Sequence, residues 1–305
     1  MKFDVVLTNP PFQDSTRRNT TPHKLWIDFT VAVFDRLLRD GGSLVQVSPA
    51  SFSSPSNVVL TLMQEHQTKM LRFGTEHHFP SVASTFSDYW VVKAENTGPT
   101  TVVTAEERFD ISLDRSVTYL PNDVGQLAMG VHKKVMFAGR PLLDVRWDYV
   151  TCHNSKRRGA NPTVVTEQTS EHPHPLFHTN NIIWWSSVRQ DWANQPKVMW
   201  TRSGYTKPFF DDGVLGGSDM AYYVPVADDA EGRILEANLN TEVMRYILRT
   251  AKWAGFASDR VFASLPDLPR ARPLTDDEMN AHFNLTEQEV AHVRQSLAPR
   301  RRTAR

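Results

Sequence analysis

The first hundred residues alternate between apolar runs and amphipathic segments. Residues 3–8 (FDVVLT) form an apolar run of β-favouring residues, which predicts a strand of an α/β sheet covered on both faces. Apolar residues then recur at helical spacing over 24–39, and Gly41 and Gly42 follow where a left-handed helix cap needs glycine. Residues 43–48 predict the next strand. This β-α-β unit should be right-handed and lay its helix on the sheet.

The same pattern predicts one more helix and two more strands. Residues 55–70 are amphipathic and predict a helix, and residues 85–93, dense in aromatic side chains, predict a strand. A last strand is expected at 100–104. At Leu120-Pro121-Asn122-Asp123 the alternation ends, and short apolar stretches joined by glycine turns follow. We therefore expect a domain boundary near residue 120.

The second half of the chain predicts short strands and then helices. Residues 235–252 carry an amphipathic pattern that predicts one helix. Thr275 and Thr286 each precede a glutamate by three positions, which is the pattern of a capping box and predicts two short helices. The short strands are expected at 180–185, 197–205, 209–213 and 220–226.

Composition is that of an ordinary globular protein and limits what the chain binds. Its 305 residues are 40% apolar and 22% charged, with 34 basic and 34 acidic side chains, so a global basic surface is excluded and any contact with DNA must come from a local patch. The single cysteine, Cys152, excludes an internal disulfide and fits a reducing cytoplasm. We find no signal peptide, no membrane-spanning run and no histidine cluster at metal-ligand spacing.

The segment Asn9-Pro10-Pro11-Phe12 directly follows the first predicted strand. The two prolines stop the strand and stiffen the backbone, so Asn9 and Phe12 project from a loop at the carboxyl end of the strand, where open α/β sheets bind their ligands. Such a loop suits methylation of an exocyclic amine. The Asn9 amide oxygen and the Pro10 carbonyl would each accept an N–H of the amine, and Phe12 would stack on a base that has left the duplex.

Asn9-Pro10-Pro11-Phe12 resembles the signature of the N6-adenine DNA methyltransferases, in which Asn/Asp-Pro-Pro-Phe/Tyr follows the fourth strand of the sheet. The resemblance implies S-adenosylmethionine as the methyl donor and double-stranded DNA as the substrate. It also implies a second aromatic side chain against the flipped base, and the sequence leaves open whether this is Phe86, Tyr89 or Trp90.

The segment after the loop also looks like its counterpart in these methyltransferases. Its order is a polar loop, a helix that begins Lys-x-Trp, two glycines, a strand and then Pro-x-Ser-Phe. The resemblance implies that Lys24 and Trp26 lie near the cofactor side.

The resemblance extends to the region that would read DNA. The run Lys197 to Gly204 looks like segments of target-recognition domains in restriction-modification adenine methylases, and Arg202 and Lys207 are the expected contacts, because arginine can bond guanine O6 and N7 together. The densest basic loop before the tail contains Lys156, Arg157 and Arg158, for which we expect phosphate or groove contacts. A solvated surface loop is the alternative for these three side chains.

The expected fold class is α/β, as a partial Rossmann-like class I methyltransferase sheet joined to a mixed α+β target-recognition domain. Residues 1–120 would form the C-terminal half of the catalytic domain and carry the loop. Residues 121–265 would form the target-recognition domain, and residues 266–305 a helical extension with a basic tail.

Family members carry three further strands and a glycine-rich S-adenosylmethionine loop before the catalytic loop, and we find no convincing equivalent here. If residues 3–8 are the family's fourth strand, the neighbouring first strand is not found, and a long apolar edge is left open. Parts of the sheet's apolar faces would be bare as well. We therefore expect a partner polypeptide that carries the cofactor-binding half, with a homodimer as the second alternative.

Two other functions stay open at this point. A catalytically inactive DNA-binding specificity or decoy subunit would keep the loop as a base-binding pocket without transferring a methyl group, and a chance motif in an unrelated globular protein is the third interpretation. The resemblance implies a bacterial or phage-encoded protein of the cytoplasm.

Overall fold

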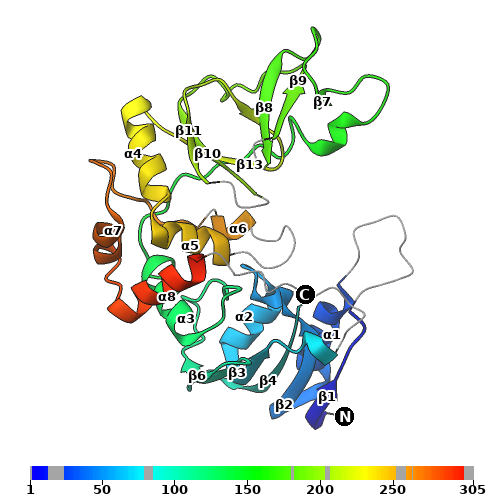
Figure 1. The fold of residues 1–305 in the computed structure, drawn as a ribbon. Helices are drawn as coiled ribbons and strands as arrows, with labels where there is room; N and C mark the ends of the chain where they lie inside the picture. Colours follow the sequence, from blue (N-terminus) through cyan, green and yellow to red (C-terminus); the bar gives the residue numbers. More distant parts are fainter. Residues whose placement is uncertain are drawn as a thin grey trace, which may run out of the picture. The chain divides into compact units, whose positions relative to one another are not determined.

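The computed structural model describes residues 2–12, 24–78, 85–179, 182–202, 207–251, 259–262 and 264–298. The chain divides into two compact units (Figure 1), the first reaching Lys133 and the second formed by 134–251 together with the described residues from 259 onward. The domain boundaries expected at residues 120 and 265 stay predictions.

The first unit is built on one six-stranded mixed sheet in the order β1-β2-β4-β3-β5-β6, drawn in blue to cyan in Figure 1. β1 runs parallel to β2, and β4 lies antiparallel between β2 and β3. β3 pairs in parallel with β5, and β6 closes the far side as an antiparallel partner of β5. The strands are β1 (Phe3–Thr8), β2 (Leu38–Pro49), β3 (His66–Phe73), β4 (Phe86–Glu95), β5 (Thr100–Val103) and β6 (Arg108–Ile111).

The connection from β1 to β2 contains α1 (Leu25–Ala32), which continues as a π-helical turn, Val33–Leu37. The predicted β-α-β order is therefore confirmed, but the boundary is wrong, because β2 begins at Leu38 rather than Ser43. Phe3 pairs with Leu38 and Val5 with Ser43, so the intervening residues of β2 bulge out of the ladder.

Two glycines make this bulge feasible. Gly41 has φ +76°, a left-handed conformation that favours glycine. A Cβ on Gly42 would lie 2.9 Å from the Arg39 carbonyl oxygen and 3.0 Å from that of Phe3. Gly41 and Gly42 were expected to cap a helix. They instead allow the backbones of β1 and β2 to approach closely.

The second helix is shorter than predicted. The chain is helical over α2 (Val58–Glu65), whose first turn is capped by the Asn57 side chain accepting from the Val59 N–H at 3.0 Å. From His66 the chain is β3, because β4 and β5 pair with it on both sides. The strands predicted at 85–93 and 100–104 are confirmed as β4 and β5.

Side chains on the two faces of this sheet have different exposure. One face is buried against α1 and α2, and the other exposes apolar side chains on β1. The prediction that β1 is covered on both faces is wrong for the described residues, because Phe3, Val5 and Leu7 leave one face exposed. The strand also lies at the edge of the sheet. Exposed fractions on β1 are 41% for Phe3, 61% for Val5 and 79% for Leu7. On the buried face lie Leu44, Leu71, Tyr89, Val91 and Val102, with Thr30, Val59 and Met63 of the helices also buried.

The second unit contains two small sheets and most of the helices. One sheet has the order β11-β10-β13 and the other β12-β8-β9-β7. A strand lies in each of the four predicted ranges, but those predicted at 197–205 and 209–213 end early, at Thr201 and Asp211. Residues 180–181 and 203–206 lie outside the described ranges. The strands are β7 (Val164–Val165), β8 (His174–Thr179), β9 (Ile182–Ser186), β10 (Lys197–Thr201), β11 (Phe209–Asp211), β12 (Gly216–Gly217) and β13 (Ala221–Pro225).

The single helix predicted at 235–252 is wrong, because two helices occupy this region. α4 (Asp229–Leu239) ends where the Asn240 side chain donates to the Pro208 carbonyl oxygen at 2.7 Å, and α5 (Glu242–Thr250) begins after Thr241. Both predicted capping boxes are confirmed at Thr275 and Thr286. The other helices are α3 (Gln126–Val135), α6 (Asp259–Phe262), α7 (Asp276–His282) and α8 (Glu287–Leu297).

None of the helices in the described part of the chain has the length and apolar character needed to cross a membrane.

Candidate functional site

The segment Asn9–Phe12 lies at the carboxyl end of β1. Since β1 and β2 are parallel, with Thr8 opposite Gln46, the loop lies at the edge of the sheet where β2 also ends, which is where open α/β sheets bind ligands. Pro10 is buried, whereas Asn9 and Pro11 are exposed. Among the described residues the Asn9 side chain has no hydrogen-bond partner. The loop therefore presents a carboxamide at the surface on a stiff backbone.

Phe12 packs against the first residue of β4. Its ring centroid lies 5.2 Å from that of Phe86, with an angle of 40° between the ring planes. Phe86 is 1% exposed and Phe12 is half-buried. The structure thus brings together Phe12, which was expected to stack on the base, and Phe86, one of the three candidates for the second aromatic.

The other two stacking candidates occupy different environments. Tyr89 is buried, and its hydroxyl lies 3.4 Å from Thr30 Oγ1, which also accepts from the Gln46 amide at 2.7 Å. Burial raises the pKa of the Tyr89 hydroxyl well above its usual value. Trp90 is 40% exposed, and its indole N–H donates to Ser43 Oγ at 3.1 Å. Successive residues of a strand point to opposite faces, so Trp90 lies on the face away from Tyr89.

Buried hydroxyls gather at the same end of the sheet as the loop. Ser53 follows the end of β2, Ser87 is the second residue of β4, and Thr75 lies just beyond β3. All three hydroxyl oxygens are buried and have no hydrogen-bond partner among the described residues. Unpaired buried hydroxyls are uncommon in folded proteins. They make this end of the core polar, in contrast to the apolar core beneath α2.

The two residues predicted near the cofactor side lie at the start of α1. Lys24 is exposed and immediately precedes the helix. Trp26 is 1% exposed, and its carbonyl oxygen accepts from Thr30 Oγ1 at 2.7 Å. The Trp26 ring is therefore part of the core of the first unit, and a role for either residue in cofactor binding stays a prediction.

The predicted basic loop belongs to the second unit. Lys156 and Arg157 lie in a 3₁₀ turn, Asn154–Arg157, and these two side chains and Arg158 are all exposed. The Arg157 guanidinium lies 4.5 Å from the centre of the buried Trp184 ring. The backbone N–H of Asn154 donates to Asp219 Oδ1 at 3.0 Å. Cation–π packing and this hydrogen bond hold the turn on the underlying sheet.

Arg202 is connected to the same region. Its backbone N–H donates to the Met220 carbonyl oxygen at 2.7 Å, next to Asp219, and its guanidinium lies 5.9 Å from the centre of the Tyr149 ring. The Tyr149 ring contacts the His153 ring at 5.0 Å, and His153 directly precedes the basic turn. The structure thus joins Arg202 to the basic turn through Tyr149, which the sequence analysis did not identify. Lys207 is exposed.

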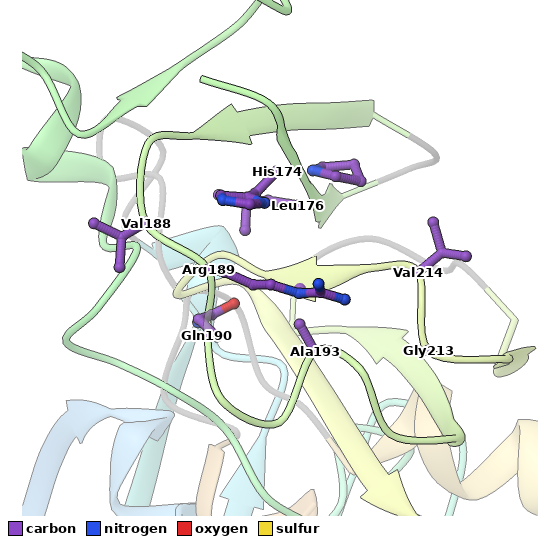
Figure 2. Close-up of a pocket in the computed structure, with 10 residues that line it drawn as sticks. His174, Leu176, Val188, Arg189, Gln190, Ala193, Gly213 and Val214 are labelled. Carbon is purple, nitrogen blue, oxygen red and sulfur yellow. The ribbon is translucent and has the colours of Figure 1, made fainter. Parts of the chain in front are cut away.

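A pocket of about 310 Å³ lies elsewhere in the second unit. Figure 2 shows Arg189 extending along it between His174 and Ala193, with Val214 at one end. None of the residues predicted from the sequence lines this pocket. No group of three or more histidine, cysteine or acidic residues in the described ranges is placed to hold a metal ion.

The sequence matches no family model and no curated protein. Over 97% of its length the chain is similar in structure to part of the type IIL restriction-modification enzyme MmeI in complex with DNA, at 9% identity, covering 55% of that chain, with a TM-score of 0.44. It is similar over the same share to a nuclease-deletion mutant of the type ISP restriction-modification enzyme LlaGI in complex with a DNA substrate mimic, at 12% identity, covering 42% of that chain, with a TM-score of 0.45.

Over 34% of its length the chain is also similar to the M protein of the type I restriction enzyme EcoKI, at 17% identity, covering 25% of that chain, with a TM-score of 0.28. The chain therefore spans about a quarter to about a half of the lengths of these proteins.

Proposed function

We propose that this chain is the catalytic-loop and target-recognition part of a site-specific DNA adenine-N6 methyltransferase that uses S-adenosylmethionine. One observation carries the proposal: the Asn9–Phe12 segment, which resembles the adenine-methyltransferase signature, lies at the carboxyl end of a parallel strand with Asn9 exposed and Phe12 against Phe86. Position and residue types together support methylation of an exocyclic amine as the chemistry of this loop.

The loop provides the two hydrogen-bond acceptors that this chemistry needs. The lone pair of the adenine N6 amine is delocalised into the ring, so the amine is a poor nucleophile. Acceptance of one N–H by the Asn9 amide oxygen and the other by the Pro10 carbonyl favours a tetrahedral nitrogen whose lone pair points at the methyl donor. Transfer would form the N6–CH3 bond as the S–CH3 bond breaks, leaving S-adenosylhomocysteine, and the methylated nitrogen would then lose one proton to water. Because the step needs alignment more than proton abstraction, we assign no general base.

Phe12 and Phe86 would hold the base that has left the duplex. A flipped base is read by hydrogen bonds to its edge and by stacking against aromatic side chains. Phe12 is half-buried, so part of its ring is accessible while Phe86 supports it from the core. In this proposal Phe12 stacks on the adenine and Phe86 fixes the orientation of Phe12.

S-adenosylmethionine supplies an electrophilic methyl group when bound. The described residues of the first unit do not fit the whole cofactor: beside the loop, β1 presents apolar side chains and an unpaired strand edge rather than a glycine-rich loop or a carboxylate placed for a ribose. The one acidic residue of β1, Asp4, is paired with Arg39. In this proposal, residues outside the described ranges complete the cofactor site, and we assign them to a partner polypeptide.

We assign the partner to the open side of β1. Within the described residues β1 pairs with β2 alone, and the exposed Val5 and Leu7 lie beside that edge. A parallel strand added to β1 would bring a crossover helix that covers the exposed face, since parallel sheets are covered on both faces. If a second copy paired antiparallel with β1, the exposed apolar faces of the two sheets would lie next to each other, and both would stay uncovered. A separate α/β polypeptide fits better than a homodimer.

Methyl transfer by Asn9 variants tests the proposed function. Duplex DNA is incubated with the full chain and S-adenosylmethionine carrying a labelled methyl group, with and without the product of the neighbouring reading frame. We expect Asn9→Ala to lower the rate at least about a hundredfold, while Asn9→Asp, which keeps the oxygen acceptor, retains measurable transfer. Transfer by Asn9→Ala at the wild-type rate would remove Asn9 from the chemistry.

A catalytically inactive DNA-binding specificity or decoy subunit is the second candidate function. It is favoured by one observation, that the exposed Lys156, Arg157 and Arg158, predicted to contact DNA, lie in the second unit, whereas the described residues of the first unit show no glycine-rich cofactor loop. The same experiment separates the two functions. Duplex binding without label transfer in either mixture would support the binding subunit.

A further inference from the structure

Three large side chains are exposed within four residues of the second unit. Trp147 is 44% exposed, Tyr149 51% and Val150 70%. Trp147 is partly anchored, because its ring meets the buried Tyr222 edge-on at 6.0 Å. Tyr149 and Val150 therefore form the outermost apolar part of this segment. Exposed apolar clusters of this kind mark interaction sites more often than random surface does.

The turn that carries these side chains is held rigidly. Asp148 accepts the backbone N–H groups of Val150 and Thr151 at 3.0 and 2.9 Å. Its second oxygen accepts from the amide of Gln190 at 2.8 Å, and Gln190 is itself buried and bonded to the backbone of Gly217 in both directions. The apolar tip is thus fixed before any partner arrives, which lowers the entropy cost of binding.

Basic side chains lie close to this tip, and the exposed Asp144 nearby is paired with Arg146. Arg202 lies over the Tyr149 ring, and the three exposed basic residues at 156–158 follow shortly after it in the chain. The acidic groups nearest in contact point inward: Asp148 is used by backbone and Gln190, and Asp219 is 8% exposed and receives the Asn154 N–H. A stiff aromatic and aliphatic tip with a basic surround is complementary to a polyanion with apolar faces.

We propose that Tyr149 and Val150 form a wedge that enters bound duplex DNA at an unstacked base step, with Tyr149 stacking on a base and Arg202 beside it. This proposal rests on the proposed function in taking duplex DNA as the partner. Apolar wedges between base steps are a known means of distorting DNA, and base-aromatic stacking tolerates any sequence. The basic residues at 156–158 hold the neighbouring phosphates.

The wedge predicts a preference for DNA that is easier to unstack. We would measure the Kd of the full chain for a matched duplex and for the same duplex with one central mismatch, and follow 2-aminopurine fluorescence at that position. The wild-type chain should bind the mismatched duplex more tightly and raise the fluorescence, because a mismatch lowers the cost of unstacking.

Variants separate stacking from charge. Tyr149→Ala should weaken binding to the mismatched duplex roughly five- to a hundredfold and abolish the preference, whereas Tyr149→Phe, which keeps the ring, should retain both. Arg158→Ala should weaken both duplexes equally and reduce the salt dependence. Val214→Ser, at an apolar position 58% exposed in the same unit, is the matched control without effect.

Two kinds of failure have different signatures. If the wild-type chain binds both duplexes equally, or if Tyr149→Ala retains the preference, the wedge is wrong and the proposed function still stands. If the folded chain binds no duplex at all, the wedge and the DNA-recognition part of the proposed function are both wrong. Circular dichroism of each variant confirms that it is folded.

Discussion

Lys197 and Asp211 form a buried ion pair that organises the loop after β11. Lys197 Nζ donates to Asp211 Oδ2 at 2.6 Å and to the carbonyl oxygens of Ala193 and Gln195 at 2.8 and 3.0 Å. Asp211 also accepts the N–H groups of Gly213 and Leu215. Burial lowers the pKa of Lys197, and the Asp211 carboxylate opposes this shift.

Removing one charge of this pair should lower the free energy of unfolding. We expect Lys197→Met to lower the free energy of unfolding by about 3–5 kcal/mol, because it leaves the buried Asp211 carboxylate without its cation. The double variant Lys197→Met with Asp211→Asn should lose less than the sum of the two single variants. Urea denaturation followed by tryptophan fluorescence measures all three, and additive losses would show that the two residues are not coupled.

His178 should make the second unit sensitive to acid. Its ring stacks on Trp184 with centroids 3.4 Å apart, and its Nδ1 lies 2.7 Å from Ser218 Oγ. Burial lowers the pKa of His178 to about 4, with Asp219 opposing and Arg157 assisting the shift. The unfolded chain binds the proton at its ordinary pKa near 6.5, so stability is complete above about pH 7 and falls as the pH drops toward 4.

This stability loss can be assigned to His178 by substitution. After discounting for partial exposure, we expect the free energy of unfolding to fall by about 1–2 kcal/mol between pH 7 and pH 4.5. His178→Phe keeps a stacked ring and should flatten this slope. The pKa of His282 is also lowered, by burial and by Arg140. His282 contributes to the pH dependence of both the wild-type and the His178→Phe protein, so the difference between their slopes reports His178. Identical slopes would contradict the assignment.

At the scale of single residues, the sequence identified groups that act through local chemistry. The capping threonines Thr275 and Thr286 were predictable because a capping box joins residues three positions apart. Asn9 and Phe12 were selected from their motif, and their roles stay predictions. Tyr149 was missed because its exposure and its contact with Arg202 depend on distant parts of the chain. The signal present in the sequence was the large apolar residues on both sides of Asp148, namely Trp147, Tyr149 and Val150.

Among the elements, β1 has the exposure that the proposed partner requires. Its odd-numbered side chains are exposed, and Leu7 lies in register with Val45 of β2, which is opposite Trp90 of β4. Paired residues in a sheet point to the same face. The exposed face therefore continues from the edge strand toward the centre of the sheet.

A charge placed on this face should affect association more than folding. Leu7→Lys should change the free energy of unfolding by no more than about 0.5 kcal/mol, because Leu7 is 79% exposed. It should also reduce self-association along the edge and block binding of the partner. Leu44→Ala, at a fully buried position of β2, should cost about 2–5 kcal/mol. A large loss with Leu7→Lys would mean that the chain itself covers this face.

Element boundaries were predicted less well than element types, for a physical reason. The strands β1, β4 and β5 follow from their own composition, but the changes from α1 to β2 and from α2 to β3 depend on pairing with strands far away in the sequence. The break between α4 and α5 likewise depends on the Asn238 and Asn240 side chains, which donate to the carbonyl oxygens of Pro269 and Pro208. A short stretch of sequence does not contain these partner residues, so the boundaries could not be predicted from it.

In the whole molecule, the two parts of the proposed activity lie in different compact units. The first unit holds the Asn9–Phe12 loop beside an open strand edge, and the second holds the basic turn, Arg202 and Tyr149. A net charge of zero does not exclude DNA as a partner, because Lys156, Arg157, Arg158 and Arg202 form a local group of cations in the second unit. A function assigned to either unit needs the other for the full reaction.

The identity of the methylated base tests the central claim most directly. Duplex DNA is incubated with the full chain, its partner polypeptide and S-adenosylmethionine carrying a deuterated methyl group, and is then digested to nucleosides for mass spectrometry. We predict deuterated N6-methyladenine, which Asn9→Ala lowers at least about a hundredfold. Label on cytosine, or N6-methyladenine that persists unchanged with Asn9→Ala, would contradict the proposal that this loop directs methyl transfer to adenine.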